Sequence, residues 1–258
     1  MHKRRWLTIL AVLALAFSGC AKEPDQQEKP EEATKQAKQA PEKTPQKILF
    51  VNTKFKDEVS QSYTTIAKAV NSIQPDVKVE IIHYSKVNPD FVKKFGAAAM
   101  LLGPQGTPWW EYDQEKLEAA REAVRQYEGP ILGICGGHQF LSVTYGGQVG
   151  PMQCAPGHKG YEGCIKEHGF TPVLKKKDDP FLADLPGEMV VTENHYECVQ
   201  KMPEGFEILA GTDMCPVQAI RMKDRPVYGV QFHPERHDDD NPHGRTILTN
   251  WLKLADLL

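Results

Sequence analysis

The chain has 258 residues, hydrophobic residues make up 40% of it, and its formal net charge is −3. A protein that binds nucleic acid needs a basic surface, so this slightly acidic balance argues against that class and we expect no nucleic-acid partner. Residues 1–46 are described below. The remaining residues, 47–258, have the length and apolar content of one folded domain.

The first twenty residues have the pattern of a secretory signal. Basic residues precede an apolar run over 7–17, and Ser18-Gly19 stands before Cys20. The run is too short for a permanent membrane-spanning helix. The Ser-Gly-Cys sequence resembles the lipobox of bacterial lipoproteins, with phenylalanine where leucine is usual. This resemblance implies that 1–19 is a signal peptide, that Cys20 is lipidated, and that the protein is anchored to a cell-envelope membrane; a plain secreted protein is the alternative.

The segment that follows Cys20 is strongly polar. Residues 21–46 contain no valine, isoleucine, leucine or aromatic residue, so they bury too little apolar surface to offset their conformational entropy. We expect residues 20–46 to be a disordered tether. Without the predicted signal the chain has 28 basic and 34 acidic residues, so acyl chains rather than a basic patch would hold it at the membrane.

Strand-like and helix-like segments alternate through the first half of the domain. Short apolar runs predict strands at 47–53, 77–84, 97–103 and 131–134. Helical periodicity predicts helices at 57–73, 112–127 and 137–145. This alternation indicates an α/β fold with a doubly wound, mainly parallel sheet, whose ligands bind at the carboxyl ends of the strands.

The second half of the domain changes character. It contains β-like runs with few helical windows between them, at 189–199, 206–212, 216–222 and 226–233. These runs predict a small added β-region of mixed or antiparallel strands. The chain closes with an amphipathic helix at 244–258.

The stretch GPILGICGGHQFL places one cysteine between a strand-like run and a glycine-rich helix start. This is the pattern of a nucleophile elbow, in which Gly133, Gly136 and Gly137 leave room for a tight turn. The first N–H groups of the helix favour a thiolate at Cys135, and the Gly136 amide is placed to bind an oxyanion. The alternatives are a buried structural thiol or half of a metal site with His138.

A nucleophilic thiol needs a base, and the base needs a carboxylate that orients it. The stretch GVQFHPE (229–235) provides both, because His233 follows a strand-like run and Glu235 comes two residues later. Strand ends in a parallel sheet meet at one edge. We therefore expect Cys135, His233 and Glu235 to form a catalytic triad.

The two motifs GICGGHQ and GVQFHPE resemble the signatures of class I glutamine amidotransferase domains. LLGPQGTP (101–108) is similar to the oxyanion loop of that family, and VTENHYECV (191–199) to a stretch that ends in His-x-Asp. The resemblance covers nearly all of 47–258. It implies a flavodoxin-like sheet and a cysteine that attacks a γ-glutamyl amide to form a glutamyl thioester, with no cofactor and no metal.

The resemblance also assigns roles to single residues. It implies an oxyanion hole made by the amides of Gly103 and Gly136. It implies that the glutamyl part of the substrate is held by Gln139, His195 and Glu197. Two positions depart from the family pattern, since Leu102 stands for a glycine and Glu197 for an aspartate. From the residues alone, His195 could equally be a hydrogen-bonded core histidine.

Four cysteines have no predicted role: Cys154, Cys164, Cys198 and Cys215. Outside the cytoplasm they can pair in three ways. Cys154 with Cys164 is the expected pair, because both lie in one glycine-rich loop, and free buried thiols are the alternative.

Two further features stay open. The acidic run 238–240 is expected to be a solvated loop, with a calcium site as the alternative. Trp109 and Trp110 are expected either to line the pocket or to cap the core.

The function expected from these features is a stand-alone hydrolase. No synthase domain is recognisable in the sequence, and the predicted signal would take the chain where ATP is scarce. Within the family that it resembles, this favours a γ-glutamyl hydrolase type: a lipid-anchored, extracytoplasmic enzyme that cleaves γ-glutamyl amide bonds of a small substrate. The alternatives are a glutaminase subunit that delivers ammonia to a separate synthase partner, and a non-catalytic binding module on the same fold.

Overall fold

The computed structural model describes residues 46–258. The predicted signal peptide, the lipidation site at Cys20 and nearly all of the predicted tether therefore lie outside the described residues. Within 46–258, no helix combines the length and the apolar character that crossing a bilayer requires.

A nine-stranded sheet forms the centre of the domain, in the order β2-β1-β3-β4-β11-β10-β9-β6-β7. The first five strands in that order are parallel: β2 (Lys78–His83), β1 (Lys47–Asn52), β3 (Ala99–Leu102), β4 (Ile131–Ile134) and β11 (Val227–Val230). The others are antiparallel: β10 (Ala219–Met222), β9 (Phe206–Gly211), β6 (Glu167–Lys175) and β7 (Glu188–His195). The predicted α/β fold with a mainly parallel sheet is confirmed, and the predicted β-region extends this same sheet.

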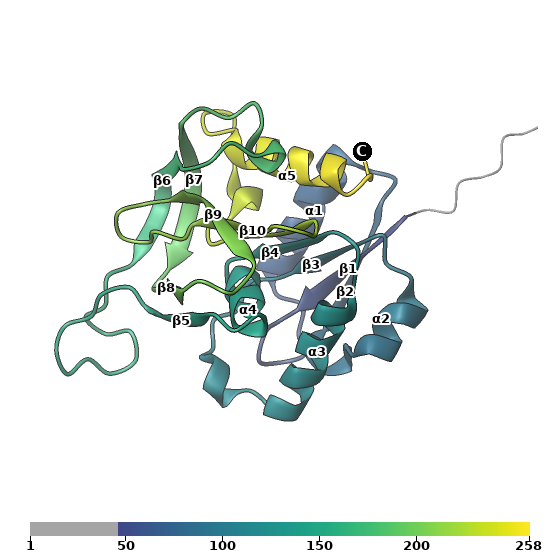
Figure 1. Ribbon diagram of the computed structural model, residues 1–258, viewed down its shortest axis with the longest axis horizontal. Coiled ribbons are helices and arrows are strands. Elements are labelled where there is room, and N and C mark those ends of the chain that lie inside the picture. The colour runs from purple at the N-terminus through teal and green to yellow at the C-terminus, as the bar shows by residue number, and fades with distance from the viewer. Residues whose placement is uncertain (1–45) are drawn as a thin grey trace, which may run out of the picture. The chain divides into compact units, whose positions relative to one another are not determined.

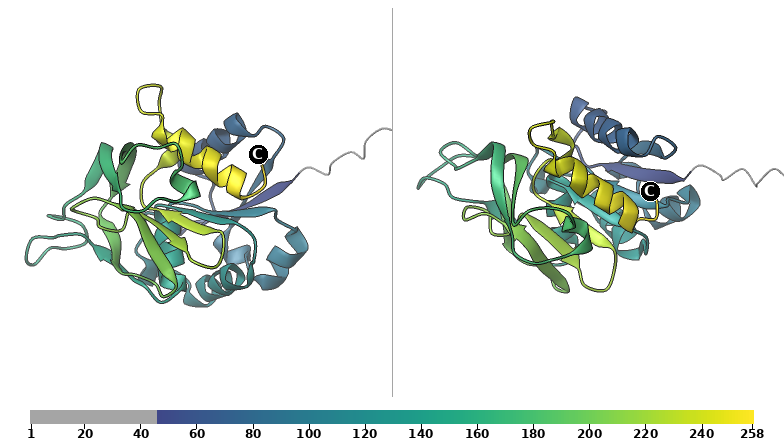
Figure 2. Two further views of the ribbon diagram at one scale, coloured as in Figure 1. Left: turned by 45° about the horizontal axis from the view of Figure 1, so that its top comes forward. Right: turned by 90° about the horizontal axis from the view of Figure 1, so that it is seen from above.

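Helices cover both faces of the sheet (Figures 1 and 2). The helices on one face are α1 (Gln61–Ile73) and α5 (His243–Leu254), and those on the other are α2 (Pro89–Phe95), α3 (Gln114–Gln126) and α4 (Gly136–Thr144). Side chains alternate along a strand, so Ile48 and Phe50 of β1 pack with α1 and α5 while Leu49 and Val51 pack on the other face. Single 3₁₀ turns occur at Tyr84–Lys86, Trp109–Glu111, Pro180–Leu182 and Pro234–Arg236.

A second sheet of two antiparallel strands, β5 (Gln148–Pro151) and β8 (Glu197–Lys201), lies beside the main sheet. The predicted single run 189–199 is therefore wrong, because it divides at Tyr196 into β7 and β8 of different sheets. The segment between β5 and β6 projects from the domain as a loop, at the lower left of Figure 1.

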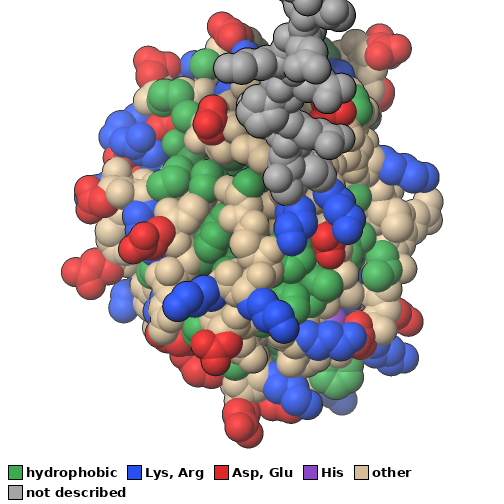
Figure 3. All heavy atoms as spheres, turned by 90° about the vertical axis from the view of Figure 1, so that its right-hand side faces the viewer, with side chains coloured by type: hydrophobic (Ala, Val, Ile, Leu, Met, Phe, Trp, Pro, Cys, Tyr) green, Lys and Arg blue, Asp and Glu red, His purple; other side chains and the backbone are tan. Residues whose placement is uncertain are grey.

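Two more differences from the sequence expectations concern local structure. Helix α1 begins after Ser60 rather than at 57, and Val59 remains 54% exposed in front of it. Helix α2, with Asn88 as its N-cap and Gly96 in the left-handed conformation at its end, was not predicted. On the face shown in Figure 3, basic and acidic side chains are interspersed with apolar ones.

Candidate active site

Three neighbouring backbone segments bring the predicted triad together. Cys135 follows β4, and its amide donates to the carbonyl of Val230 at the end of β11 at 2.8 Å. The chain continues from β11 to His233, whose amide donates to the carbonyl of Thr192 in β7, also at 2.8 Å. The cysteine and the histidine are therefore fixed by hydrogen bonds between strands rather than by loops.

Cys135 occupies a strained turn between β4 and α4. Its φ is 52° and its ψ −106°, a conformation that is costly for a residue with a side chain and common at nucleophiles. The glycines around it allow close backbone approach, as predicted. A Cβ on Gly137 would lie 2.0 Å from the carbonyl oxygen of Leu102, and one on Gly133 would lie 2.5 Å from that of Gly137. No larger residue fits at either position without displacing backbone.

The side chains of Cys135, His233 and Glu235 form a connected triad. His233 Nδ1 lies 2.8 Å from Glu235 Oε1. The ring also lies close enough to Cys135 for that residue to raise its pKa. Burial opposes a charge on His233, but the Glu235 carboxylate and the Cys135 thiolate outweigh it and raise the pKa of the imidazole to about 10. The arrangement is that of a cysteine nucleophile beside an imidazole that a carboxylate orients.

A chain of glutamine side chains reaches the nucleophile, and sequence reasoning found only one of its members. Gln231 Nε2 donates to Cys135 Sγ at 3.7 Å, and Gln139 Nε2 donates to Gln231 Oε1 at 3.4 Å. Gln105 Nε2 then donates to Gln139 Oε1 at 3.3 Å. Gln231 lies inside the GVQFHPE motif and Gln105 inside the GPQGTP motif, so position within the motifs was the only available signal.

The predicted oxyanion hole is only half supported. The Gly136 amide is the first N–H of α4, and the first N–H groups of a helix have no acceptor within it. The Gly103 amide instead donates to the carbonyl of Val51 at 3.1 Å, because the chain continues the pairing of β3 with β1 by one residue. Gly103 as an oxyanion donor is therefore wrong for this structure. The backbone nitrogen of Gln105 lies beside Gly136, 2.4 Å from where a Cβ on Gly136 would be.

Buried hydroxyl groups hold the loop that begins at Gly103. Thr53 Oγ1 donates to the Gly103 carbonyl at 2.7 Å, and the Tyr63 hydroxyl donates to the Pro104 carbonyl at 2.9 Å. The same Tyr63 oxygen accepts from the Thr53 amide at 2.8 Å. The loop beside Cys135 is thus tied to β1 and α1.

A cavity of about 220 Å³ opens onto Cys135. Its lining residues are Gln105, Gly106, Cys135, Gln139, Tyr161, Lys166, Asn194, His195, Tyr196 and Glu197. The three predicted substrate residues Gln139, His195 and Glu197 therefore lie together around one cavity. A larger cavity of about 570 Å³ lies against α2 and α3, but it shares no lining residue with this one and contains no cysteine or histidine.

The ring nitrogens of His195 face protein groups rather than the cavity. Nδ1 lies 2.8 Å from the Glu197 carbonyl oxygen, which fixes the N–H on that side. Nε2 lies 3.1 Å from Glu167 and 3.0 Å from Glu193. Burial opposes a charge on His195, but these two carboxylates raise the pKa of the ring to about 10. His195 is therefore a buried imidazolium below the cavity, the alternative that the sequence left open.

Glu193 is the least satisfied member of this cluster, and no sequence motif singled it out. It is fully buried, and neither carboxylate oxygen has a hydrogen bond within the described part of the chain. Its 3.0 Å contact to His195 is an ion pair only, because the single Nε2 proton also faces Glu167. Burial raises the pKa of Glu193, and the nearby imidazole groups offset this only in part.

Two groups in residues 46–258 bring three side chains of metal-binding type within 4.8 Å of one another. In the first group Cys154 and Cys164 are joined in a disulfide, so neither sulfur is a thiolate ligand. In the second, His195 lies with Glu167 and Cys215, and both Glu167 oxygens accept hydrogen bonds, from Thr212 and Gln218 at 2.6 and 2.7 Å. Protein hydrogen bonds account for this second arrangement.

The structure decides several of the open alternatives. The expected disulfide Cys154–Cys164 is present, whereas Cys198 and Cys215 are buried free thiols. All three residues of the run 238–240 are exposed, and the run is absent from the metal-type groups found in the described residues. Trp109 packs against Tyr112 and Phe140 in the core.

The fold and the site together define a class: an amidohydrolase with a cysteine nucleophile at the edge of a mainly parallel sheet. The family model for glutamine amidotransferase class-I matches residues 54–254. The chain belongs to the class I glutamine amidotransferase family.

Two relatives and one solved structure illustrate the similarity. The chain is 37% identical over 143 residues to the glutamine-hydrolysing GMP synthase subunit of Methanocaldococcus jannaschii, covering 55% of this chain and 69% of the relative. It is 37% identical over 210 residues to the same subunit of Methanosarcina barkeri, covering 81% and 97%. A crystal structure of the corresponding GMP synthase subunit from Thermoplasma acidophilum superposes with a TM-score of 0.67 at 25% identity, covering 83% and 95%.

Proposed function

We propose that this chain hydrolyses the side-chain amide of glutamine and delivers the ammonia to a synthase on a separate polypeptide. The observation that carries the proposal is the connected triad of Cys135, His233 and Glu235, whose thiol faces a small cavity. The relatives, which are glutamine-hydrolysing subunits of a synthase, support this function over the γ-glutamyl hydrolase type expected from the sequence.

The reaction follows from the arrangement of the triad. The thiolate of Cys135 attacks the amide carbon, and the negative charge on the carbonyl oxygen is received by the Gly136 amide and the neighbouring Gln105 amide. His233 gives its proton to the amide nitrogen, and ammonia leaves as the thioester forms. His233 then takes a proton from water, which attacks the thioester and releases glutamate.

The cavity walls carry charges that match a free amino acid. Glu197 is 7% exposed and lines the cavity, where its carboxylate suits an α-ammonium group. Lys166 lines the same cavity and suits an α-carboxylate. Glu197 and Lys166 would bind the α-amino-acid end of a glutamyl substrate, and Gln139 would lie beside its amide end at the thiol.

The test measures glutamate and ammonia from glutamine, first with the purified chain and then with the synthase and its nucleotide substrates added. We expect equal release of both products and faster turnover when the synthase is present. Absence of glutamate release under both conditions, with the thiol of Cys135 intact, would overturn the proposal.

A second candidate is the anchored stand-alone hydrolase, and one structural observation favours it. The Cys154–Cys164 disulfide is typical of proteins that work in oxidising compartments, and so is a secretory signal. This candidate predicts that labelled palmitate is incorporated at Cys20, that Cys20→Ala abolishes incorporation, and that γ-glutamyl peptides are cleaved without a partner. A chain found in the cytoplasm without acylation would contradict it.

A further inference from the structure

We infer that the disulfide-closed loop between β5 and β6 is part of the substrate site, and that Tyr161 on this loop is a specificity-determining residue for the glutamyl group. This inference rests on the proposed hydrolysis of a glutamyl amide at Cys135. It goes beyond that function by making substrate affinity depend on a loop outside the triad.

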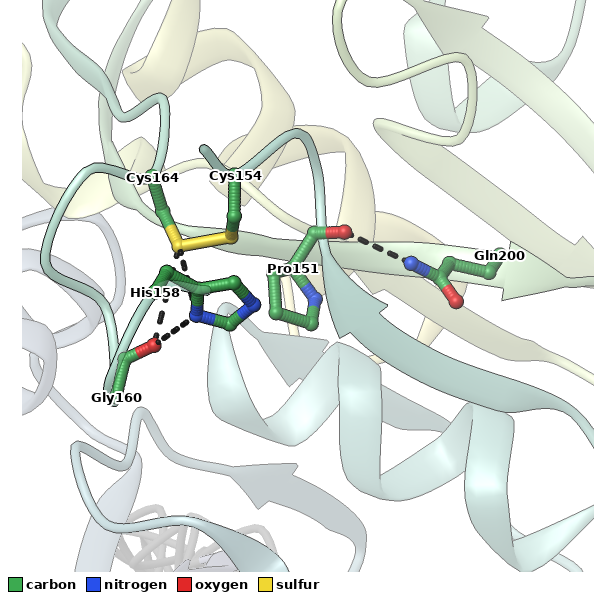
Figure 4. Close-up of a disulfide and its surroundings, with 6 residues drawn as sticks. All are labelled: Pro151, Cys154, His158, Gly160, Cys164 and Gln200. Carbon is green, nitrogen blue, oxygen red and sulfur yellow. Dashed lines mark hydrogen bonds between the residues drawn. A yellow bond between two sulfur atoms is a disulfide. The ribbon is translucent and has the colours of Figure 1, made fainter. Parts of the chain in front are cut away.

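The loop between β5 and β6 is a hydrogen-bonded hairpin. The amide of Ala155 donates to the carbonyl of Gly163 at 3.0 Å, and the amide of Ile165 donates to that of Gln153 at 2.7 Å. The Cys154–Cys164 disulfide lies between these two bonds (Figure 4). Covalent closure therefore fixes both sides of the hairpin at its base.

Within the closed segment, short contacts define the path of the chain. His158 Nδ1 donates to the Gly160 carbonyl at 2.9 Å, and the amide of Cys164 donates to the Tyr161 carbonyl at 3.1 Å. The position of Tyr161 is thus tied to a disulfide cysteine through one backbone hydrogen bond.

The base of the hairpin is attached to β8, which begins at Glu197, and to Tyr196 just before it. The amide of Met152 donates to the carbonyl of Tyr196 at 2.9 Å, and Gln200 Nε2 of β8 donates to the Pro151 carbonyl at 2.8 Å, as Figure 4 shows. These contacts place the hairpin over the start of β8.

The Tyr161 side chain is the point at which the hairpin meets the cavity. Its ring stacks on that of Tyr196, with centroids 5.0 Å apart and planes 6° apart. Its hydroxyl lies close enough to Glu197 to act against burial, which raises the pKa of that carboxyl. Tyr161, Tyr196 and Glu197 all line the cavity beside Cys135. Lys166, just beyond the hairpin, lies 5.2 Å over the Tyr196 ring.

The physical consequence concerns both charged walls of the cavity. The Tyr161 side chain flanks Glu197 in the cavity wall. The stacked rings of Tyr161 and Tyr196 support the Lys166 ammonium by a cation–π contact. None of these groups touches Cys135 or His233 in the described contacts. Loss of Tyr161 should therefore weaken substrate binding and leave the chemical step nearly unchanged.

The test compares KM and kcat for glutamine in the full chain and in Tyr161→Ala, Tyr161→Phe and the double variant Cys154→Ser/Cys164→Ser. Loss of the ring that stacks on Tyr196 and of the hydroxyl beside Glu197 predicts that KM rises about tenfold in Tyr161→Ala, with kcat within about twofold of wild type. Tyr161→Phe keeps the stacked ring, so its KM should lie between those of wild type and Tyr161→Ala. Lys159→Ala, an exposed change on the same loop, is the control.

A second measurement distinguishes an effect on the cavity wall from an effect on the catalytic triad. The rate of alkylation of Cys135 is measured with a diazoketone analogue of glutamine and with iodoacetamide, which is small and has no glutamyl group. Tyr161→Ala should slow only the glutamine analogue. Slowing of both reagents would mean that the substitution damages the triad, and the inference would be wrong.

Reduction of the Cys154–Cys164 disulfide provides a third test. A dithiol reductant transfers two electrons to the Cys154–Cys164 disulfide, leaving two thiols and becoming a cyclic disulfide itself. Reduced wild type should then show the raised KM of the double serine variant, which should not respond to the reductant. Unchanged KM in Tyr161→Ala and in the double variant, with an active wild type, overturns the inference alone. A wild type with no turnover and no selective alkylation overturns the proposed function.

Discussion

The charge state of His233 connects its surroundings to the proton transfers of the reaction. Burial by itself would keep the imidazole neutral, and Glu235 together with the Cys135 thiolate reverses that preference. The histidine therefore holds a proton through the neutral range in the free protein. It is ready to protonate the leaving nitrogen as soon as the thiolate attacks.

This charge state predicts an alkaline limit to activity. With the pKa of His233 raised to about 10, kcat/KM should fall as the pH rises through about 10, because the proton donor is lost. Glu235→Gln removes a group that raises this pKa, so the fall should move to lower pH. A pH–rate profile of both proteins measures the two limits. An alkaline limb at the same pH in the variant would contradict the role of Glu235.

A second prediction concerns Gln231, whose amide donates to the nucleophilic sulfur. A hydrogen bond to a charged group is worth about 1.5 kcal/mol or more, so Gln231→Leu should lower kcat/KM about tenfold. Gln126→Leu, an exposed change on α3, is the control for the substitution itself. Equal kcat/KM in wild type and Gln231→Leu would show that the contact does not stabilise the thiolate.

Among single residues, the sequence predicted correctly those that lie close together within one motif. His233 and Glu235 are two positions apart, so their 2.8 Å contact needs only a tight local turn. The failure at Gly103 has a different cause. Whether a backbone N–H faces the cavity or the neighbouring strand depends on where sheet pairing ends. Here the pairing of β3 with β1 continues to the Gly103 amide.

The nucleophile elbow is the element on which the site depends. Helix α4 begins immediately after Cys135, and eight of its nine residues are buried. It packs its first turn against the end of β3, where Gly137 meets the backbone of Leu102. Tight packing here fixes the sulfur and the Gly136 amide relative to each other.

Gly137→Ala tests that packing. The added methyl group would meet the Leu102 carbonyl at 2.0 Å, so β3 and α4 must separate, and we expect a loss of at least about 1–3 kcal/mol of unfolding free energy. Gly187→Ala is the matched control, since a Cβ at Gly187 meets nothing within 4 Å. Urea denaturation of both variants measures the difference. Equal midpoints would contradict close approach as the reason for this glycine.

The strongly periodic elements were predicted within a few residues, and the errors have physical reasons. Helix α2 is a seven-residue helix, too short for a periodic pattern to show. The run 189–199 looked like one strand because its β-like composition is continuous. The break at Tyr196 is imposed by tertiary packing, since β8 pairs with β5 and β7 pairs with β6.

At the scale of the whole molecule, buried ionisable groups make stability depend on pH. The pKa of His195 is about 10 in the folded protein, above its ordinary value of 6.5. Its stabilising effect is therefore complete below about pH 6.5 and is lost as the pH rises towards 10. Burial also raises the pKa of Glu193, so stability falls further as the pH rises from the ordinary pKa of this group to its folded-state pKa.

We therefore expect the free energy of unfolding to fall between pH 7 and pH 10. Glu193→Gln removes one of the two carboxylates that raise the pKa of His195, so it should make this fall shallower. His168→Asn, at an exposed histidine, should leave the fall unchanged. Urea midpoints across this range measure both slopes. A constant or rising stability of wild type up to pH 10 would contradict the buried charge cluster.

The identity of the acyl-enzyme tests the central claim most directly. The full chain is mixed with glutamine, quenched in acid within milliseconds to seconds, and digested for mass spectrometry. We predict a glutamyl group on the peptide that contains Cys135, none in Cys135→Ala, and wild-type labelling in Cys198→Ala, which changes another buried free cysteine. Release of glutamate and ammonia by Cys135→Ala at the wild-type rate would contradict the account.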